Sequence, residues 1–423
     1  MRRNLTEGGV FKNVLLFSLP YLLSYFLQTL YGMADLFIVG QFEGVASTTA
    51  VSIGSQVMHM LTVMIVGLAM GSTVSIGQAV GGGREKRAAR SIGNTATLFM
   101  SLSVLLMAGL LLLVRPIVRV MSTPEAAVSG AEAYLTICFI GIPFITAYNI
   151  ISSIFRGLGD SKSPMYFIAV ACAVNIALDY LFMGALHLGS AGAALGTTLS
   201  QAVSVAVSLI VIRKRNIGVP VALQDGLIQV AFIVITIIAN QRGLTDAAAV
   251  GIVEKVISFL FLVPSSMLST VSALGAQNIG AGKPERTVRT LGYACLLAAG
   301  FGLTVAAAVQ FVAEGIVGLF TTDSGAIAAG SQYLRGYIWD CLFAGLYFSF
   351  SGYFCACGKS GLSFLHNIIA IALVRVPGVY LTSRLFPETL LPMGLATAAG
   401  SLLSVVICVV AFAALRRREA AHG

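Results

Sequence analysis

Apolar residues fill twelve long runs of the chain, and short clusters of charged residues, Gly and Pro separate these runs. Each run is close to or longer than the roughly 20 residues that a helix needs to cross a bilayer core. No strict alternation of apolar and polar residues persists, so helices rather than barrel strands are the predicted spanning elements. The predicted spans cover residues 13–39, 47–72, 93–115, 131–155, 164–186, 189–212, 217–239, 247–272, 290–319, 330–354, 361–385 and 391–415.

Composition excludes a soluble globular protein. Of 423 residues, 57% are hydrophobic and only 10% are charged, whereas an ordinary soluble domain has about 25% charged residues. So few charges cannot cover the surface of a water-soluble fold of this size. We therefore expect an all-α integral membrane protein that crosses the bilayer many times.

Basic residues predict the orientation of the spans. The net charge is +9, but the basic residues are divided among short loops instead of lying on one face, which argues against nucleic acid as a partner. Lys and Arg accumulate in cytoplasmic loops, so the sequence predicts that both termini are cytoplasmic and that the first span stays as an uncleaved anchor in the plasma (cell inner) membrane. On the terminal side lie 19 of the 26 basic residues: Arg2, Arg3, Lys12, Arg84, Lys86, Arg87, Arg90, Arg156, Lys162, Arg213, Lys214, Arg215, Lys283, Arg286, Arg289, Lys359, Arg416, Arg417 and Arg418.

The two halves of the chain repeat each other at a shift of 199 residues. Close packing of helices in lipid explains recurrent glycines, but it does not explain matched Arg and Tyr residues. Gln78, Gly81, Gly83, Arg87, Arg90 and Gly93 correspond to Gln277, Gly280, Gly282, Arg286, Arg289 and Gly292, and Tyr134 corresponds to Tyr333. Six helices therefore repeat as six in the same orientation, a transporter architecture with the pathway between the halves.

The interiors of the predicted spans of the first half contain two acids, Asp35 and Asp179, and no Lys or Arg. Asn175 lies one turn before Asp179 on the same helical face. Counted from the outer ends of their spans, Asp35, Asp179 and Thr197 lie at depths of about 6, 10 and 12 Å, so they can meet. Carboxylates without a basic partner at low dielectric must hold a proton, a metal cation or a cationic substrate. The alternative is that both acids are protonated and only join neighbouring helices.

Acids and bases occur together in the second half. Glu254 and Lys255 lie in the eighth predicted span, Asp340 in the tenth and Arg375 in the eleventh. A structural or gating network of ion pairs is the favoured interpretation.

Several other polar residues inside spans either join helices or line a pathway, and these alternatives stay open for Gln28, Gln56, Asn149, Gln201 and Gln224. No Walker loop, paired metal-ligand spacing or Ser/His/Asp grouping occurs. We therefore expect no enzyme activity, no cofactor and no use of ATP.

Six segments, taken in order, resemble the multidrug and toxic compound extrusion (MATE) family of secondary transporters over nearly the whole chain. They are Pro20 with residues 28–35 (QTLYGMAD), residues 77–83 (GQAVGGG), residues 155–164 (FRGLGDSKSP), residues 175–179, residues 192–197 (GAALGT), and residues 218–220 (GVP) with Gln224.

The resemblance implies two six-helix lobes in a V-shaped arrangement, at residues 1–212 and 217–415, with a short basic linker at residues 213–216 and a cytoplasmic tail at residues 416–423. It also implies a coupling-ion site in the first lobe at Asp35, Asn175, Asp179 and Thr197, with the carbonyl of Ala193, where Na⁺ is one candidate. Two departures from the family pattern stand out. Gln224 and an early Asp340 argue against a second-lobe coupling site, and the linker is unusually short.

The expected function is antiport by a monomer, in which small cationic or lipophilic compounds leave in exchange for Na⁺ or H⁺, with membrane lipid around the protein. A flippase for lipids or lipid-linked sugars is the main alternative, although it would need a cationic cavity to hold pyrophosphate. A channel or a non-transporting scaffold is a third.

Overall fold

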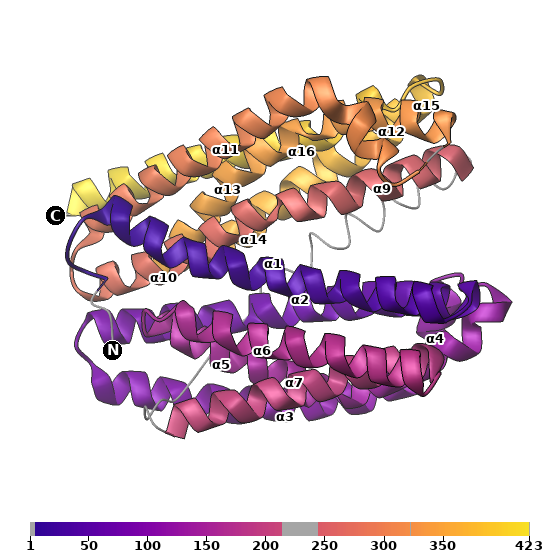
Figure 1. Ribbon diagram of the computed structural model, residues 1–423. Helices are drawn as coiled ribbons and strands as arrows, with labels where there is room; N and C mark the ends of the chain where they lie inside the picture. The colour runs from indigo at the N-terminus through magenta and orange to yellow at the C-terminus, as the bar shows by residue number, and fades with distance from the viewer. Residues whose placement is uncertain (1–4, 214–243, 322, 423) are drawn as a thin grey trace. The chain divides into compact units, whose positions relative to one another are not determined.

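The computed structural model describes residues 5–213, 244–321 and 323–422, and nearly all of these residues are helical (Figure 1). The helices of the first half are α1 Val10–Phe42, α2 Val45–Gly81, α3 Glu85–Val120, α4 Glu125–Ile140, α5 Ile142–Gly157, α6 Lys162–Asp179, the π-helix η1 Tyr180–Ala185, and α7 Gly189–Arg213. Those of the second half are α9 Leu244–Leu260, α10 Leu262–Gly280, α11 Pro284–Gly318, α12 Ser324–Tyr337, α13 Trp339–Ala356, α14 Ser360–Ala370, the π-helix η2 Ile371–Arg375, α15 Val376–Leu385 and α16 Leu391–His422.

Ten of the twelve predicted spans have, among the described residues, a counterpart that is long and apolar enough to cross a bilayer. Nine are single helical stretches that are long and apolar enough to cross a bilayer, and the tenth is the pair α4 and α5, which is bent by 49°. The predicted span at 330–354 is divided between α12 and α13, which meet at Ile338. The predicted span at 217–239 and Gln224 lie outside the described residues. The all-helical fold class is thus confirmed, whereas the count of twelve is not established in full.

Backbone geometry repeats with the sequence. Two glycines that end helices in the first half, Gly83 and Gly159, have φ values of 66° and 85°, and their counterparts Gly282 and Gly358 both have a φ of 71°. Only glycine adopts this left-handed conformation without strain. The hydrogen bonds that close these turns match as well: Arg84 N to Ala79 O, Lys283 N to Asn278 O, Asp160 N to Phe155 O and Lys359 N to Phe354 O are each 2.8 Å. All these pairs are 199 residues apart, so the repeat holds in the fold of its loops.

The described residues form two compact units. Residues 19–213 form the first unit, and residues 5–18 pack with residues 244–422 in the second. The first turns of α1 thus belong to a different unit from the rest of the helix, whereas the predicted first lobe begins at residue 1. Most of the predicted linker lies outside the described residues, so its role as the boundary stays a prediction.

Basic side chains hold the segment before α1 in the second unit. Lys283 Nζ donates a hydrogen bond to the carbonyl oxygen of Thr6 at 3.1 Å. Arg286 Nη2 donates to the carbonyl oxygens of Glu7 at 3.2 Å and Gly8 at 3.0 Å. Basic side chains of the predicted loop after the eighth span therefore hydrogen-bond the backbone carbonyls that precede the first helical turn.

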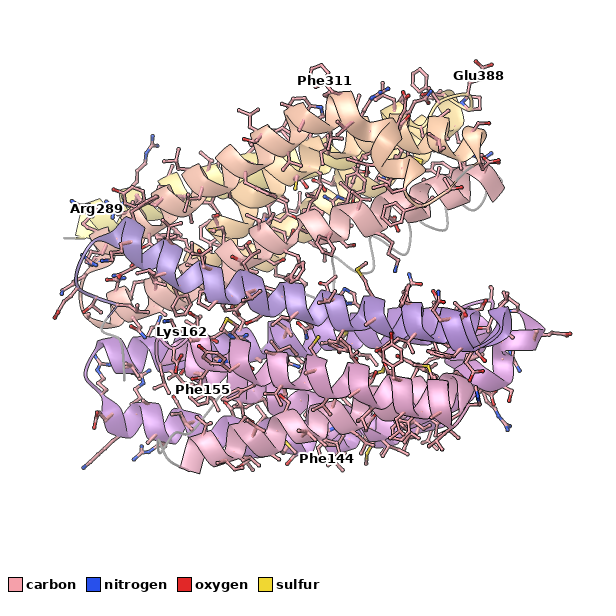
Figure 2. The ribbon with its side chains drawn as sticks, in the orientation of Figure 1. Phe144, Phe155, Lys162, Arg289, Phe311 and Glu388 are labelled. Carbon is pink, nitrogen blue, oxygen red and sulfur yellow. The ribbon has the colours of Figure 1, made fainter. Side chains whose placement is uncertain are left out.

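Apolar side chains cover the outside of each unit as well as its core. Phe311 on α11 is 87% exposed and extends away from its helix (Figure 2). In the second unit, Arg289 and Glu388 mark opposite ends of the helical bundle (Figure 2). An apolar outer surface between polar ends is the pattern expected of helices that are surrounded by lipid.

Candidate functional site

Four polar side chains from three helices meet inside the first unit. Asp35 lies on α1, Asn175 and Asp179 lie in the last two turns of α6, and Thr197 lies on α7. All four are buried. The helical spacing of Asn175 and Asp179 places both on the face of α6 that packs against α7. The structure therefore brings together the four side chains that the sequence predicted to meet.

Hydrogen bonding inside this cluster is incomplete. Thr197 Oγ1 donates to Asp35 Oδ2 at 3.0 Å. The other oxygen of Asp35, both carboxylate oxygens of Asp179 and both amide atoms of Asn175 are buried without a hydrogen-bond partner among the described residues. Asp35 nevertheless lies close enough to Asp179 and Asn175 to interact with them. Buried polar atoms are normally paired. The unpaired oxygen and nitrogen atoms of this cluster are therefore available to bind a further group.

Charge in the cluster is unbalanced. Neither Asp35 nor Asp179 forms an ion pair with a Lys or Arg of the described chain. The buried arginine of the first unit, Arg156, instead donates to Ser153 Oγ at 3.0 Å, and its guanidinium lies 4.9 Å from the ring centre of Tyr21. Two adjacent carboxyl groups at low dielectric cannot both carry a bare charge. Chemically, the cluster can accept a proton or a small cation.

Small residues on α7 leave space for the side chain of Asp179. Gly196 has no side chain, and a Cβ atom there would overlap Asp179 Oδ1. Ala193 is fully buried about one turn before Gly196 and Thr197. The sequence predicted Ala193 and Thr197 as site residues, but it gave no role to Gly196. The signal was its position beside Thr197, where a close approach of helices needs a glycine.

Two further polar residues border the cluster. Tyr31 lies one turn before Asp35 on α1 and interacts with both Asp35 and Gln201 of α7. Gln201 is buried, and its Oε1 has no hydrogen-bond partner among the described residues. Gln201 was a candidate lining residue, whereas Tyr31 was missed, although its four-residue spacing from Asp35 could have revealed it.

The other candidate lining residues do not join the cluster in one manner. Asn149 is buried on α5, and its Nδ2 donates to the carbonyl of Ile145 on its own helix at 2.8 Å. Gln28 on α1 is half-buried, and Gln56 on α2 is exposed. For these three residues the alternatives of pathway lining and helix joining stay open.

A closed ion pair lies in the second unit. Arg375 at the end of η2 donates through Nη2 to both carboxylate oxygens of Asp340 on α13, at 3.1 and 2.9 Å. The same nitrogen lies 2.6 Å from Ser401 Oγ on α16. All three side chains are buried. This pair is compensated in charge, in contrast to the acids of the first unit.

The remaining two members of the predicted second-half network lie elsewhere. Glu254 on α9 is half-buried and interacts with Tyr333 and Tyr337 of α12. Lys255 is exposed and forms no ion pair among the described residues. Neighbouring residues point about 100° apart on a helix, so only one of the two faces the interior.

The comparison with known families bears on the whole chain. A model of the MatE family matches residues 20–181 and matches again over residues 220–381, which together are more than half of the chain. The chain belongs to the MatE family. Because one model matches twice, it also confirms the internal repeat, and this MatE protein is a multi-pass membrane protein.

Relatives of this MatE protein cover nearly its whole length. The probable multidrug resistance protein YpnP of Bacillus subtilis (strain 168) is 28% identical over 392 residues, 88% of each chain. The probable multidrug resistance protein YoeA of the same strain is 28% identical over 90% of this chain and 88% of its own. A solved multidrug resistance MATE family transporter of the MOP superfamily, in an outward-facing conformation, has a TM-score of 0.87 at 22% identity and covers 99% of this chain and 97% of its own. That structure confirms the fold.

Proposed function

We propose that this MatE protein is a secondary active antiporter that exports cationic or lipophilic compounds in exchange for Na⁺ or H⁺. The coupling cation binds at Asp35 and Asp179, with Asn175, Thr197 and the carbonyl of Ala193 as further ligands. Both termini are cytoplasmic, and the drug leaves on the opposite side. The names of the curated relatives, which are probable multidrug resistance proteins, support the choice of cargo.

One observation carries the proposal: two buried acids lie together without a base. The carboxylates of Asp35 and Asp179 are near neighbours, and three of their four oxygens have no hydrogen-bond partner among the described residues. A purely structural cluster would leave these groups costly to bury. Alternate binding and release of a cation at this site explains why unpaired carboxyl groups are buried there in spite of the cost in free energy.

Helix α1 supplies a route from cation binding to a conformational change. It carries Asp35, contains Pro20 within its length, and has its first turns in the second unit. Proline removes a backbone hydrogen bond and lowers the resistance of a helix to bending. Cation binding at Asp35 then favours one packing of α1, and by linkage a bound drug weakens cation binding as much as the cation weakens drug binding.

The test is Asp35→Asn in proteoliposomes with an imposed gradient and a cationic dye as cargo. We expect efflux to fall to background, because the amide keeps the size of the side chain but cannot carry the negative charge. Glu125→Gln is the matched control, since Glu125 is exposed at the start of α4 and its loss removes the same charge. Unchanged efflux by Asp35→Asn, with normal amounts of folded protein, would exclude the cluster as the coupling site.

The same vesicles identify the ion. Dye efflux is measured with a Na⁺ gradient at uniform pH, and separately with a pH gradient at uniform Na⁺. Antiport requires that one gradient drives efflux and that an ionophore for that ion abolishes it. Dye movement that ignores both gradients contradicts antiport and favours a flippase or a channel.

A further inference from the structure

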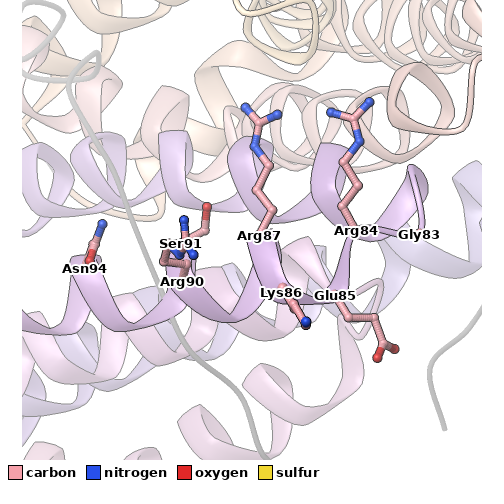
Figure 3. A pocket seen from close by; sticks show the side chains of 8 residues that line it. All are labelled: Gly83, Arg84, Glu85, Lys86, Arg87, Arg90, Ser91 and Asn94. Atoms are coloured by element: carbon pink, nitrogen blue, oxygen red, sulfur yellow. The ribbon is translucent and has the colours of Figure 1, made fainter.

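A basic cavity opens at the junction of α2 and α3 in the first unit. Its volume is about 980 Å³. Four cationic side chains and one acidic side chain line it, together with two polar side chains and a glycine: Arg84, Lys86, Arg87, Arg90, Glu85, Ser91, Asn94 and Gly83 (Figure 3). The described lining residues therefore have a net charge of +3, which attracts an anion.

One face of α3 presents most of the donors. Arg87, Ser91 and Asn94 are spaced by four and three residues, which places them along a single side of the helix, and Arg84 directly precedes its first residue. The hydroxyl of Ser91 also lies 3.2 Å from that of Ser75 on α2. Figure 3 shows the guanidinium groups of Arg84 and Arg87 side by side, whereas Glu85 points away from them. Paired guanidinium groups bind phosphate oxygens in a bidentate manner.

The equivalent basic side chains of the second unit show how such residues bind acceptor oxygens. Arg84 and Arg87 correspond to Lys283 and Arg286 at the shift of 199 residues. In the second unit, these two donate to the carbonyl oxygens of residues 6–8. The side chains of Arg84 and Arg87 make no hydrogen bond or ion pair within the part of the chain that the structure describes.

The same face of α3 becomes apolar beyond the cavity. Leu98 is one turn after Asn94 and is 53% exposed, and Leu105, two turns further, is 69% exposed. A soluble anion makes no favourable contact with this apolar surface, whereas the acyl chains of a lipid do. The sequence of charged, polar and apolar positions along one helix thus follows the profile of a phospholipid from its headgroup to its tails.

We propose that this cavity binds the phosphate headgroup of an anionic phospholipid, with the acyl chains along Leu98 and Leu105. Arg84 and Arg87 hold the phosphate, and Ser91 and Asn94 hydrogen-bond the polar part of the headgroup. The lipid belongs to the leaflet on the side of the basic loops, where anionic headgroups attract Lys and Arg. The site is independent of the proposed cation site and of the transport direction.

The experiment measures binding of fluorescent phosphatidylglycerol to the purified full chain in neutral detergent. We expect the double variant Arg84→Gln/Arg87→Gln to bind roughly 25-fold more weakly, since each basic residue near an anionic surface contributes about a factor of five. Arg115→Gln/Arg119→Gln is the matched control, because it removes two exposed charges near the opposite end of the same helix. It should bind as the native chain does.

Two further arms separate lipid from a free anion. Fluorescent phosphatidylcholine should bind at least tenfold more weakly than phosphatidylglycerol, and a large excess of glycerol phosphate should not displace the lipid. Leu98→Asn/Leu105→Asn should weaken lipid binding even though both arginines remain. Equal loss in the two arginine double variants, equal binding of the two lipids, or full displacement by glycerol phosphate would each overturn the proposal.

Discussion

Each unit of this MatE protein buries a charged side chain in the fifth span of its half, but the two units balance that charge in opposite ways. In the first unit, Asp179 ends α6, which lies in the fifth predicted span of its half, and faces another acid. In the second unit, Arg375 lies in the corresponding span and faces Asp340. Each side chain packs closely against a glycine of the following span, since a Cβ atom at Gly196 would overlap Asp179 and one at Gly400 would lie 2.7 Å from Arg375 Cβ.

Both units thus pack a charged side chain of the fifth span against a glycine of the sixth, although the shift of 199 residues does not pair these residues and the charge balance differs. A compensated pair such as Asp340 and Arg375 is complete without a ligand. An uncompensated pair such as Asp35 and Asp179 needs a proton or a cation to balance its charge. The proposed function assigns ion coupling to the first unit and a structural role to the second because of that single difference.

The largest expected effect comes from breaking the compensated pair. Arg375→Met leaves the buried Asp340 without its partner, and removal of one partner of a buried pair costs about 3 to 5 kcal/mol of unfolding free energy. Thermal unfolding in detergent should show a large drop in Tm. The double variant Asp340→Leu/Arg375→Met should recover most of the stability, because no bare charge remains. A Tm unchanged by Arg375→Met would mean that the pair does not hold the second unit together.

Next in size is the loss of the hydroxyl that holds Asp35. Thr197→Val keeps the shape of the side chain but removes the donor to Asp35 Oδ2, and hydrogen bonds to charged groups contribute about 1.5 to 3 kcal/mol. The concentration of coupling ion that half-saturates efflux should rise about tenfold or more. Thr197→Ser, which keeps the hydroxyl, is the control. If Val and Ser behave alike, the hydrogen bond is not part of cation binding.

A smaller effect is expected at the glycine beside Asp179. Gly196→Ala forces the carboxylate of Asp179 to move, and overpacking of this kind costs about 1 to 3 kcal/mol. Coupled efflux should fall together with Tm. Gly109→Ala on α3 is the matched control, because open space surrounds that position, and alanine there should stabilise its helix by up to about 1 kcal/mol. Full activity of Gly196→Ala would show that the position of Asp179 does not depend on the absence of a side chain at residue 196.

Much of the fold could be predicted because lipid imposes strong rules on sequence. Run length predicted the spans, and matched Arg and Gly residues predicted the repeat. Depth along a span, counted at a fixed rise per residue, placed Asp35, Asp179 and Thr197 near enough to one another to meet. Missing basic residues then marked them as a site.

Other features depend on how helices rotate and where they break, which composition does not encode. Run length cannot show that α12 and α13 meet at Ile338, nor that residues 5–18 pack with the second unit. Tyr31 and Gly196 were missed for a related reason. Their roles follow from which helix faces face one another, and that arrangement is a property of tertiary packing. Lys255 was grouped with Glu254 because both lie at a comparable depth in their span, although a helix directs the two side chains apart.

The π-helical segment Tyr180–Ala185 interrupts the α geometry of the fifth span. A π turn contains one residue more than an α turn, so this span contains a residue that an uninterrupted α-helix would not need. The extra residue is accommodated within the π turn, so deleting one residue between 180 and 185 would restore α geometry while Asp179 and the connection to α7 keep their orientation. The same deletion in an uninterrupted α-helix would rotate its two ends by about 100° relative to each other. Along this stretch, the chain therefore tolerates a loss of length that its other helices do not.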